Sequence, residues 1–416
     1  MADNSTGVPV ADRRIPAGGD FLDAADRDKL TPAGLVEHIR SLQPFIAERA
    51  AEAERLRRPH DEVWQALRDA GFFYQFVPKK FGGMESDFDT FIDVGMAIGE
   101  VDASTAWTAT FCAEHNWILS HFPAEAQEEL WGGDFPYIIA PVVSVPPGRA
   151  EEVDGGFRVS AHWKWGTGVM HADWVIGNVL LLQDGQPPQM MMVAIPASEA
   201  EVLDTWHSSG MAATGSNDIV VKDVFVPHKF VARDVKRGGS VPAQRLHANP
   251  IYGVPLLPFL AMSASIPAVG AARGMVKGFQ ERIAAHARPG SDGAMADKVA
   301  PQIRLAKADT LARSAEILIR DAGRRMIEIP DLAEPDQTNA RLALRAQLAQ
   351  AVLFCRDAAL TLVEGAGTSI MLLDQSFQRA LRDILVVSTH VVFDVDISFE
   401  QHGRGMIGLA PNTPLN

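Results

Sequence analysis

Histidines are the residues of this chain best suited to move protons near neutral pH, because the unperturbed imidazole pKa is about 6.5. The chain has 12 of them, and none has the spacing of a metal-ligand set. The GxxxxGK(S/T), HExxH and GxSxG patterns of phosphate loops, zinc proteases and serine hydrolases are absent. We therefore expect no metal site. An isolated histidine, such as His115 or His390, is by itself no more than a structural residue.

One glycine pattern near the end of the chain imitates a dinucleotide-binding motif. Gly403, Gly405 and Gly408 match GxGxxG. That motif works only between a strand and a helix that leads into a second strand, and the eight residues after Gly408 leave no room for such a unit. We therefore do not expect this segment to bind a phosphate.

Composition excludes several classes of function. The chain has 416 residues, 47% of them hydrophobic and 22% charged, which is typical of a globular protein with a large core. Lys and Arg number 38 against 52 Asp and Glu, and the resulting net charge of −14 argues against nucleic acid as a partner. The two cysteines, Cys112 and Cys355, form no disulfide framework, and no membrane span or apolar signal core is expected, so we expect a cytoplasmic protein.

The hydrophobic period divides the chain into a helical, a strand-forming and a second helical part. We expect a flexible arm at 1–28, a helical domain at 29–134, a β domain at 135–240, a helical bundle at 241–400 and a tail at 401–416. Residues 157–165 alternate between apolar and polar, as a half-buried strand does. Short strands without intervening helices favour a small antiparallel barrel or sandwich, and long Ala- and Leu-rich segments with short joins favour a four-helix bundle. The fold class is thus α+β.

Four segments in this order resemble the acyl-CoA dehydrogenase superfamily. They are Gly210-Met211-Ala212-Ala213-Thr214-Gly215-Ser216 running into Val224-Phe225-Val226-Pro227, Trp163-Lys164-Trp165-Gly166-Thr167-Gly168, Glu281-Arg282, and Gly365-Ala366-Gly367 with Arg379 and Arg382-Asp383. The resemblance spans residues 40 to 400. It implies an N-terminal helical domain, a central β domain and a C-terminal four-helix bundle.

This chain lacks the carboxylate base that the dehydrogenases of that superfamily use. The family places a carboxylate about eight residues after the Arg-Asp pair, and that position is Val391 in this chain. The alternative location, in the first bundle helix, reads Leu257 to Ala264 without an acid. Without a carboxylate, the α-proton of an acyl thioester cannot be removed in the family's way.

Where this chain differs from the dehydrogenases, it resembles the two-component flavin monooxygenase branch, which includes the oxygenase component of p-hydroxyphenylacetate hydroxylase. Thr167-Gly168 resembles the Ser-Gly pair of that branch, with the hydroxyl retained. His390 in Ser388-Thr389-His390 matches its C-terminal histidine, and His115 in Glu114-His115-Asn116-Trp117 matches its N-terminal one.

The resemblance implies an enzyme in which reduced flavin, FMNH2 or FADH2, reacts with O2 to a C4a-hydroperoxyflavin that hydroxylates a phenol or indole. It implies His390 as the proton donor, Thr167 at flavin N5 and His115 as the base for the substrate. Further predicted flavin contacts are Trp165, Gly168, Ser144 and Arg282, and further predicted substrate contacts are Asn116, Trp117, Tyr252 and Phe259. A separate NAD(P)H-flavin reductase and a homotetramer are expected.

Three alternatives remain open. An N- or S-oxygenase of the same fold differs only in its substrate. An acyl-CoA dehydrogenase or oxidase would hold oxidised FAD tightly, and a non-enzymatic scaffold would bind no flavin.

Overall fold

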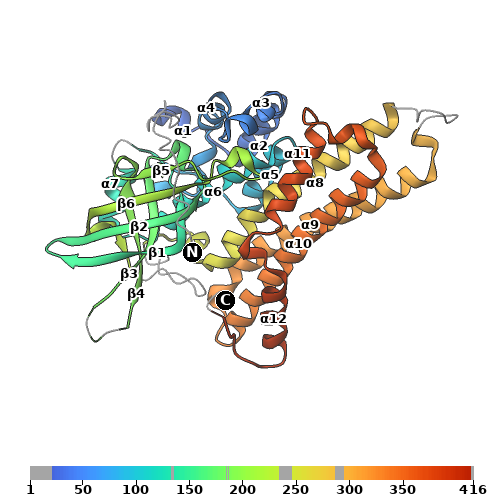
Figure 1. Cartoon of the computed structure of the whole chain (residues 1–416). Coiled ribbons are helices and arrows are strands. Elements are labelled where there is room, and N and C mark those ends of the chain that lie inside the picture. Colours follow the sequence, from blue (N-terminus) through green and yellow to red (C-terminus); the bar gives the residue numbers. More distant parts are fainter. Residues whose placement is uncertain are drawn as a thin grey trace, which may run out of the picture.

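A computed structural model describes residues 21–132, 135–183, 185, 187–233, 246–285 and 295–413. The strands form one sheet, and the long C-terminal helices stand beside it as a bundle, while α2–α4 cross one end of both (Figure 1). The expected α+β class is confirmed. Of the flexible arm expected at 1–28, residues 1–20 lie outside the described residues, whereas Ala24–Arg27 form a short helix.

The N-terminal helices begin where the sequence offers caps. Thr31 accepts a hydrogen bond from the backbone N–H of Gly34 at 3.1 Å, and Pro32 is the first residue of the helix. Asp102 caps the central helix by accepting from the backbone N–H of Thr105. The helices of this part are α1 (Ala24–Arg27), α2 (Pro32–Ser41), α3 (Gln43–Leu56), α4 (Asp61–Asp69), α5 (Phe88–Gly99), α6 (Ala103–Leu119) and α7 (Ala124–Trp131). Nearly all of α6 is buried, so it forms the centre of the molecule.

The described residues form seven strands, in the order β5-β6-β2-β1-β3-β4-β7. Their bounds are β1 Val142–Val153, β2 Gly156–Gly166, β3 Trp174–Leu181, β4 Gln189–Pro196, β5 Glu201–Leu203, β6 Asn217–Pro227 and β7 Val231–Ala232. All neighbours pair antiparallel except β1 and β3, which run parallel, so the sheet is mixed. The reason is that the chain leaves β2 and crosses to the other edge of β1 before β3 begins.

The alternation predicted along β2 holds only to Trp163. Phe157, Val159 and Trp163 are buried, whereas Trp165 keeps 57% of its surface exposed. The backbone of Trp165 has a left-handed φ of 64°, which takes its side chain out of the alternation. The strand therefore ends by presenting an indole ring to the outside.

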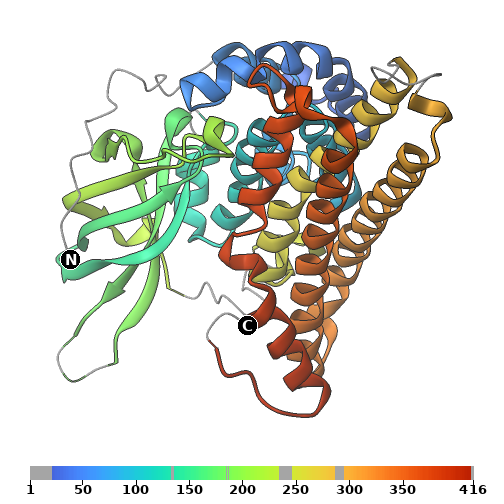
Figure 2. The same ribbon diagram turned by 45° about the vertical axis from the view of Figure 1, so that its right-hand side comes forward.

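The C-terminal helices pack as the bundle that the sequence predicts. They are α8 (Leu256–Ala285), α9 (Val299–Glu328), α10 (Asp336–Ala366), α11 (Ser376–Val387) and α12 (Val395–Met406). Helix α11 lies between the sheet and the rest of the bundle (Figure 2). Gly403 and Gly405 of the glycine pattern lie inside α12, which follows a helix and a turn rather than a strand.

Two bundle helices, α8 and α10, are long and apolar enough to cross a membrane by length and composition alone. In α8, 89% of that apolar window is buried inside the protein, as expected for the core helix of a bundle.

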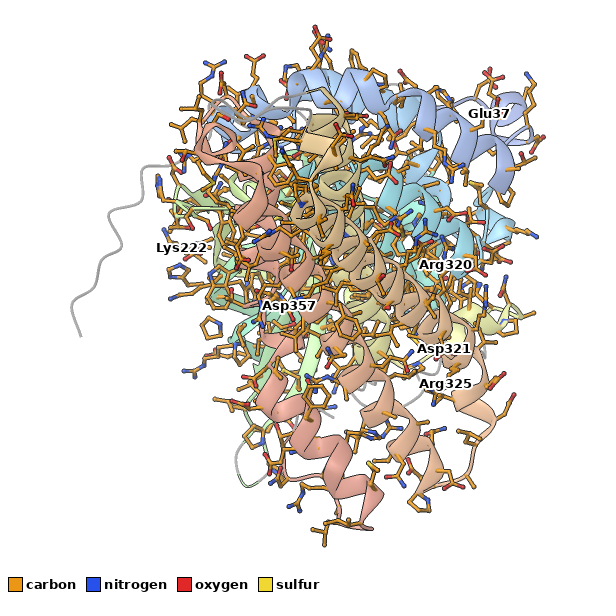
Figure 3. The ribbon with its side chains drawn as sticks, turned by 90° about the vertical axis from the view of Figure 1, so that its right-hand side faces the viewer. Glu37, Lys222, Arg320, Asp321, Arg325 and Asp357 are labelled. Atoms are coloured by element: carbon orange, nitrogen blue, oxygen red, sulfur yellow. The ribbon has the colours of Figure 1, made fainter. Side chains whose placement is uncertain are left out.

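Helix α9 carries a charged side chain that faces α5. Arg320, labelled in Figure 3, pairs with Asp93 at 2.5 Å and with Asp89 at 3.2 Å, both on α5. These ion pairs fix the bundle against the N-terminal helices.

Candidate active site

One face of α6 carries a row of rings. Trp107, Phe111 and His115 are spaced four residues apart and therefore share a helix face. The ring centroids of Trp107 and Phe111 are 4.5 Å apart in a stacked arrangement, and those of Phe111 and His115 are 5.7 Å apart edge to face. His390, which follows α11, meets the other end of the row, with its ring 5.4 Å from Trp107. Two histidines 275 positions apart in the chain are thus joined by two aromatic rings.

The hydrogen-bond partner of His115 fixes its tautomer. Its Nδ1 lies 2.5 Å from the carbonyl oxygen of Ala140, which can only accept, so Nδ1 carries the hydrogen and Nε2 is left as an acceptor. The residue is only 2% exposed, and burial lowers the pKa of His115 to about 4. The ring is therefore neutral at pH 7.

His390 has the opposite tautomer. Its Nδ1 accepts a hydrogen bond from the backbone N–H of Val392 at 3.3 Å, so the hydrogen of the neutral ring is on Nε2. The residue is half-buried, and burial lowers the pKa of His390 to about 4. His390 is therefore a neutral donor through Nε2.

A chain of hydroxyl groups ends beside the ring row. The indole N–H of Trp107 donates to Thr167 Oγ1 at 3.3 Å. Thr167 Oγ1 lies 2.9 Å from Ser216 Oγ, which in turn lies 2.9 Å from Thr214 Oγ1. Thr214 donates to the carbonyl oxygen of Met211 at 2.9 Å. The hydroxyls of the two strongest family-like segments, around Thr167 and around Thr214 to Ser216, are thus in direct contact.

Helix α11 holds the turn that carries these hydroxyls. The carboxylate of Asp383 accepts from the backbone N–H of Met211 at 2.5 Å, and Arg382 donates to the carbonyl of Ser209. A Cβ on Gly210 would lie 2.3 Å from the carbonyl oxygen of Arg382, so only glycine fits there. Arg382-Asp383 and Gly210-Met211, two separate motifs of the sequence, are therefore in direct contact with each other.

Asp383 is an unusual buried acid. It is 2% exposed, and burial, reinforced by the nearby Asp102, raises the pKa of Asp383 to about 7. Glu54 acts in the same direction, whereas Arg379 and the hydrogen bond from Met211 oppose the shift. Burial also raises the pKa of Asp102.

The structure does not bring Asn116 into the ring row. Its amide donates to the carbonyls of Cys112 and Ile138, both at 3.0 Å. Its oxygen accepts from the indole N–H of Trp131 and from the backbone N–H of Ile138. All of its hydrogen-bonding groups have protein partners, and they tie α6 to the segment that leads into the sheet.

Trp117, Tyr252 and Phe259, predicted to line the substrate pocket, lie together on the opposite side of α6. All three are fully buried. The indole of Trp117 donates to the carbonyl of Ile251 at 2.7 Å and packs against Phe259 at 5.1 Å, while the hydroxyl of Tyr252 donates to Phe76. They form core between α6 and α8, away from His115, because residues 115 and 117 face different sides of a helix.

The predicted flavin contacts occupy varied positions. Gly168 has a φ of +87°, and a Cβ there would lie 2.5 Å from the sulfur of Cys112, so glycine allows the turn to rest on α6. Ser144 is half-buried on β1. Arg282, near the end of α8, donates to the carbonyl of Ala366 at 2.9 Å and to Ser369 at 2.6 Å. No group of three or more potential metal ligands occurs among the described residues.

Sequence reasoning missed Trp107, Phe111, Thr214 and Ser216 as site residues. The signal for the two rings was their spacing of four residues before His115 on one predicted helix. For the hydroxyls it was their position in the family-like segment around Gly215. Neither signal shows which side chain faces the site.

Comparison with known proteins identifies the family of this chain. The acyl-CoA dehydrogenase N-terminal domain model matches residues 38–134, and the C-terminal domain model matches residues 262–395. A pigment production hydroxylase from Rhodococcus sp. (strain ATCC 21145) is 33% identical, over 93% of this chain and 99% of the relative. The oxygenase subunit HsaA of a flavin-dependent monooxygenase from Mycobacterium tuberculosis is 32% identical, over 91% of this chain and 96% of the relative.

Two further similar proteins carry reduced flavin in their names. The oxygenase component of an FADH2-dependent resorcinol hydroxylase from Rhizobium sp. is 30% identical, over 91% of this chain and 95% of the relative. XiaF from Streptomyces sp., solved in complex with FADH2 and glycerol, superimposes with a TM-score of 0.85 at 25% identity, over 94% of this chain and 98% of that one. The chain therefore belongs to the acyl-CoA dehydrogenase family, in its branch of two-component flavin-dependent monooxygenases.

Proposed function

We propose that this protein is an oxygenase component that uses reduced flavin and O2 to hydroxylate a small electron-rich aromatic compound of the phenol or indole type. The observation that carries the proposal is the line of contacts from His115 through Phe111 and Trp107 to His390 and Thr167. Bound reduced flavin supplies the electrons that activate dioxygen. The residues of the chain orient the substrate, exclude water and move protons.

The two histidines suit complementary parts of this chemistry. Nε2 of His115 is an acceptor, so it can take the hydrogen bond of a phenol O–H or an indole N–H and make the ring more electron-rich. Nε2 of His390 carries a hydrogen, so it can donate to an oxygen atom. Because both pKa values lie near 4, both roles are available throughout the neutral range.

The end of β2 fits a flavin ring. The exposed indole of Trp165 offers a flat apolar surface, and the hydroxyl of Thr167 lies two residues further on. Gly168 leaves the turn free of a side chain. We assign Trp165, Thr167 and Gly168 to holding the ring system, with Ser144 and Arg282 as further contacts. The names of the resorcinol hydroxylase and of the XiaF complex favour FADH2 over FMNH2.

The substrate class rests on the relatives and on the ring row. The resorcinol hydroxylase is named for a phenol, and the edge-to-face rings of α6 suit a flat aromatic guest. The acyl-CoA dehydrogenase alternative is disfavoured by Val391, which stands where the family base would be. N- or S-oxygenation uses the same site with another substrate.

The experiment supplies chemically reduced FAD or FMN, 18O2, catalase and a panel of phenols and indoles, and mass spectrometry follows the products. A product two mass units heavier than its 16O2 counterpart supports the proposal, and His115→Phe, which keeps a flat ring, is expected to lose it. Turnover with NADH alone, without a reductase, would contradict the two-component reading. Bleaching of bound oxidised flavin by an acyl-CoA would favour the dehydrogenase, and product only from amines or thioethers would favour N- or S-oxygenation.

We further propose a cytoplasmic homotetramer that receives its flavin from a separate NAD(P)H-dependent reductase. Support comes from apolar side chains on the surface of the C-terminal part, such as Leu373 at 83% and Met406 at 75% exposed. On α11 and the turn after it, Leu385 and Val391 are also exposed, whereas Ile384, Val387 and Phe393 belong to the core. Light scattering after gel filtration measures the assembly, and a monomer would contradict it.

A further inference from the structure

The hydroxyl chain that ends at Thr167 has only one direction in which all of its hydrogen bonds can be made. A carbonyl oxygen only accepts, so the 2.9 Å contact between Thr214 Oγ1 and the carbonyl of Met211 requires the hydrogen of Thr214 to lie between them. If that hydrogen pointed elsewhere, two oxygen lone pairs would face each other at 2.9 Å. The hydroxyl hydrogen of Thr214 therefore points at the carbonyl oxygen of Met211.

The remaining hydrogens follow in order. With its own hydrogen committed, Thr214 can only accept from Ser216, 2.9 Å away. Ser216 then donates to Thr214 and can only accept from Thr167, also 2.9 Å away. The hydrogen of Thr167 therefore points at Ser216. All three residues are nine-tenths or more buried, so water does not compete for these positions.

Thr167 has one position left for a ligand, and it is an acceptor. A hydroxyl has one hydrogen and two lone pairs. Its hydrogen is given to Ser216, and one lone pair is taken by the indole N–H of Trp107 at 3.3 Å. The second lone pair of the Thr167 hydroxyl stays available to a ligand at the turn that ends β2. A ligand atom that carries a hydrogen is attracted there, and one that carries only a lone pair is repelled.

We infer that Ser216 and Thr214 are positioning residues that make the Thr167 hydroxyl select reduced over oxidised flavin. The inference rests on the proposed function, which brings flavin N5 to Thr167. Reduced flavin has a hydrogen on N5, whereas oxidised flavin has a lone pair there. The fixed polarity holds the form that arrives from the reductase and repels the form that must leave after turnover. It gives this site a physical reason to bind flavin as a substrate rather than as a permanent cofactor.

The test compares the affinities of oxidised and reduced flavin for the full-length protein, under anaerobic conditions for the reduced form. In Ser216→Ala the hydrogen of Thr167 loses its acceptor and can turn to an N5 lone pair. The affinity for oxidised FAD should therefore rise about tenfold, the usual size of one hydrogen bond gained at a buried site, while that for FADH2 changes little. The same ratio appears as a fall of about 30 mV in the midpoint potential of bound flavin.

Two further variants separate polarity from damage to the site. Thr214→Val, which is nearly isosteric, frees the hydrogen of Ser216 and should shift the affinity ratio in the same direction as Ser216→Ala, which covers the case that Ser216→Ala does not fold. Thr167→Ser retains the hydroxyl and should keep the ratio of the unmodified protein. Thr167→Val should instead reduce affinity for FADH2.

The outcomes distinguish the inference from the function on which it rests. A gain in oxidised-flavin affinity in Ser216→Ala or Thr214→Val supports the fixed polarity, since a merely structural role would weaken both flavin forms together. If the unmodified protein prefers FADH2 but both variants lose affinity for the two forms equally, or change neither, the polarity is wrong and the proposed function stands. If the unmodified protein binds neither form, the proposed function itself fails.

Discussion

Replacing Asp383 by asparagine should make the stability of this protein respond differently to pH. The carboxyl of Asp383 anchors Met211 at the start of the hydroxyl-bearing turn, and burial beside Asp102 raises its pKa from 3.8 to about 7. Asparagine keeps an oxygen that can accept from Met211, and it removes the charge. The native carboxyl binds a proton more tightly than the unfolded chain does, so its contribution to stability is complete below pH 3.8 and is lost as the pH rises through 7.

The magnitude follows from the two pKa values. With pKa 3.8 in the unfolded chain and about 7 in the native protein, the contribution of Asp383 falls by about 2.5 kcal/mol between pH 5 and pH 8. An unfolding entropy of about 2.1 cal/mol/K per residue, over 416 residues, converts this into about 3 °C. Asp383→Asn should therefore gain about 3 °C relative to the unmodified protein on going from pH 5 to pH 8.

The assay is thermal unfolding of both proteins at pH 5, 6, 7 and 8. Only the difference between the two melting temperatures is interpreted, because His115 and His390 titrate in the opposite sense and cancel in the difference. Asp357→Asn is the matched control, since it makes the same change of a carboxyl to an amide on a side chain that is 51% exposed. A constant difference for Asp383→Asn would refute the reasoning.

Three further predictions concern the site. Asn116→Ala should lower the free energy of unfolding by about 3 kcal/mol even without ligand, because the buried N–H groups of Trp131 and Ile138 lose their acceptor. Unfolding and binding assays check this, and a loss of substrate affinity without a loss of stability would contradict the structural role. Gly168→Ala should cost about 2 kcal/mol from the left-handed φ together with the contact to Cys112, and a simultaneous Cys112→Ala should recover part of that loss in thermal unfolding. In 15N NMR, His115 should appear as the Nδ1–H tautomer and His390 as the Nε2–H tautomer, both neutral at pH 6, so an imidazolium signal from either at that pH would be inconsistent with their burial.

The sequence by itself predicted the elements and the family, because both depend on local patterns. The division into helical, strand-forming and helical parts and the strand expected at 157–165 follow from hydrophobic periods of 3.6 and 2 residues, and β2 keeps that alternation as far as Trp163. The Arg-Asp and Gly-Met segments, read as motifs, indicated the acyl-CoA dehydrogenase superfamily, and Thr167-Gly168, His115 and His390 indicated its flavin monooxygenase branch. Local patterns also showed that Val391 occupies the position where the dehydrogenases of the family have their carboxylate base.

Only the tertiary structure decided which side chains meet and which way their hydrogens point. Trp107 and Thr167 are 60 positions apart, and Asp383 and Met211 are 172 apart, so no local period connects them. Asn116 and Trp117, one and two residues after His115, have their polar groups satisfied elsewhere because a helix turns its successive residues to different sides. The tautomers of the histidines and the polarity of Thr167 depend on the acceptors of Ala140 and Met211 and on the backbone N–H donor of Val392, which the packing of three separate parts of the chain brings into place. A hydrogen bond joins atoms across space, and the sequence records only their order along the chain.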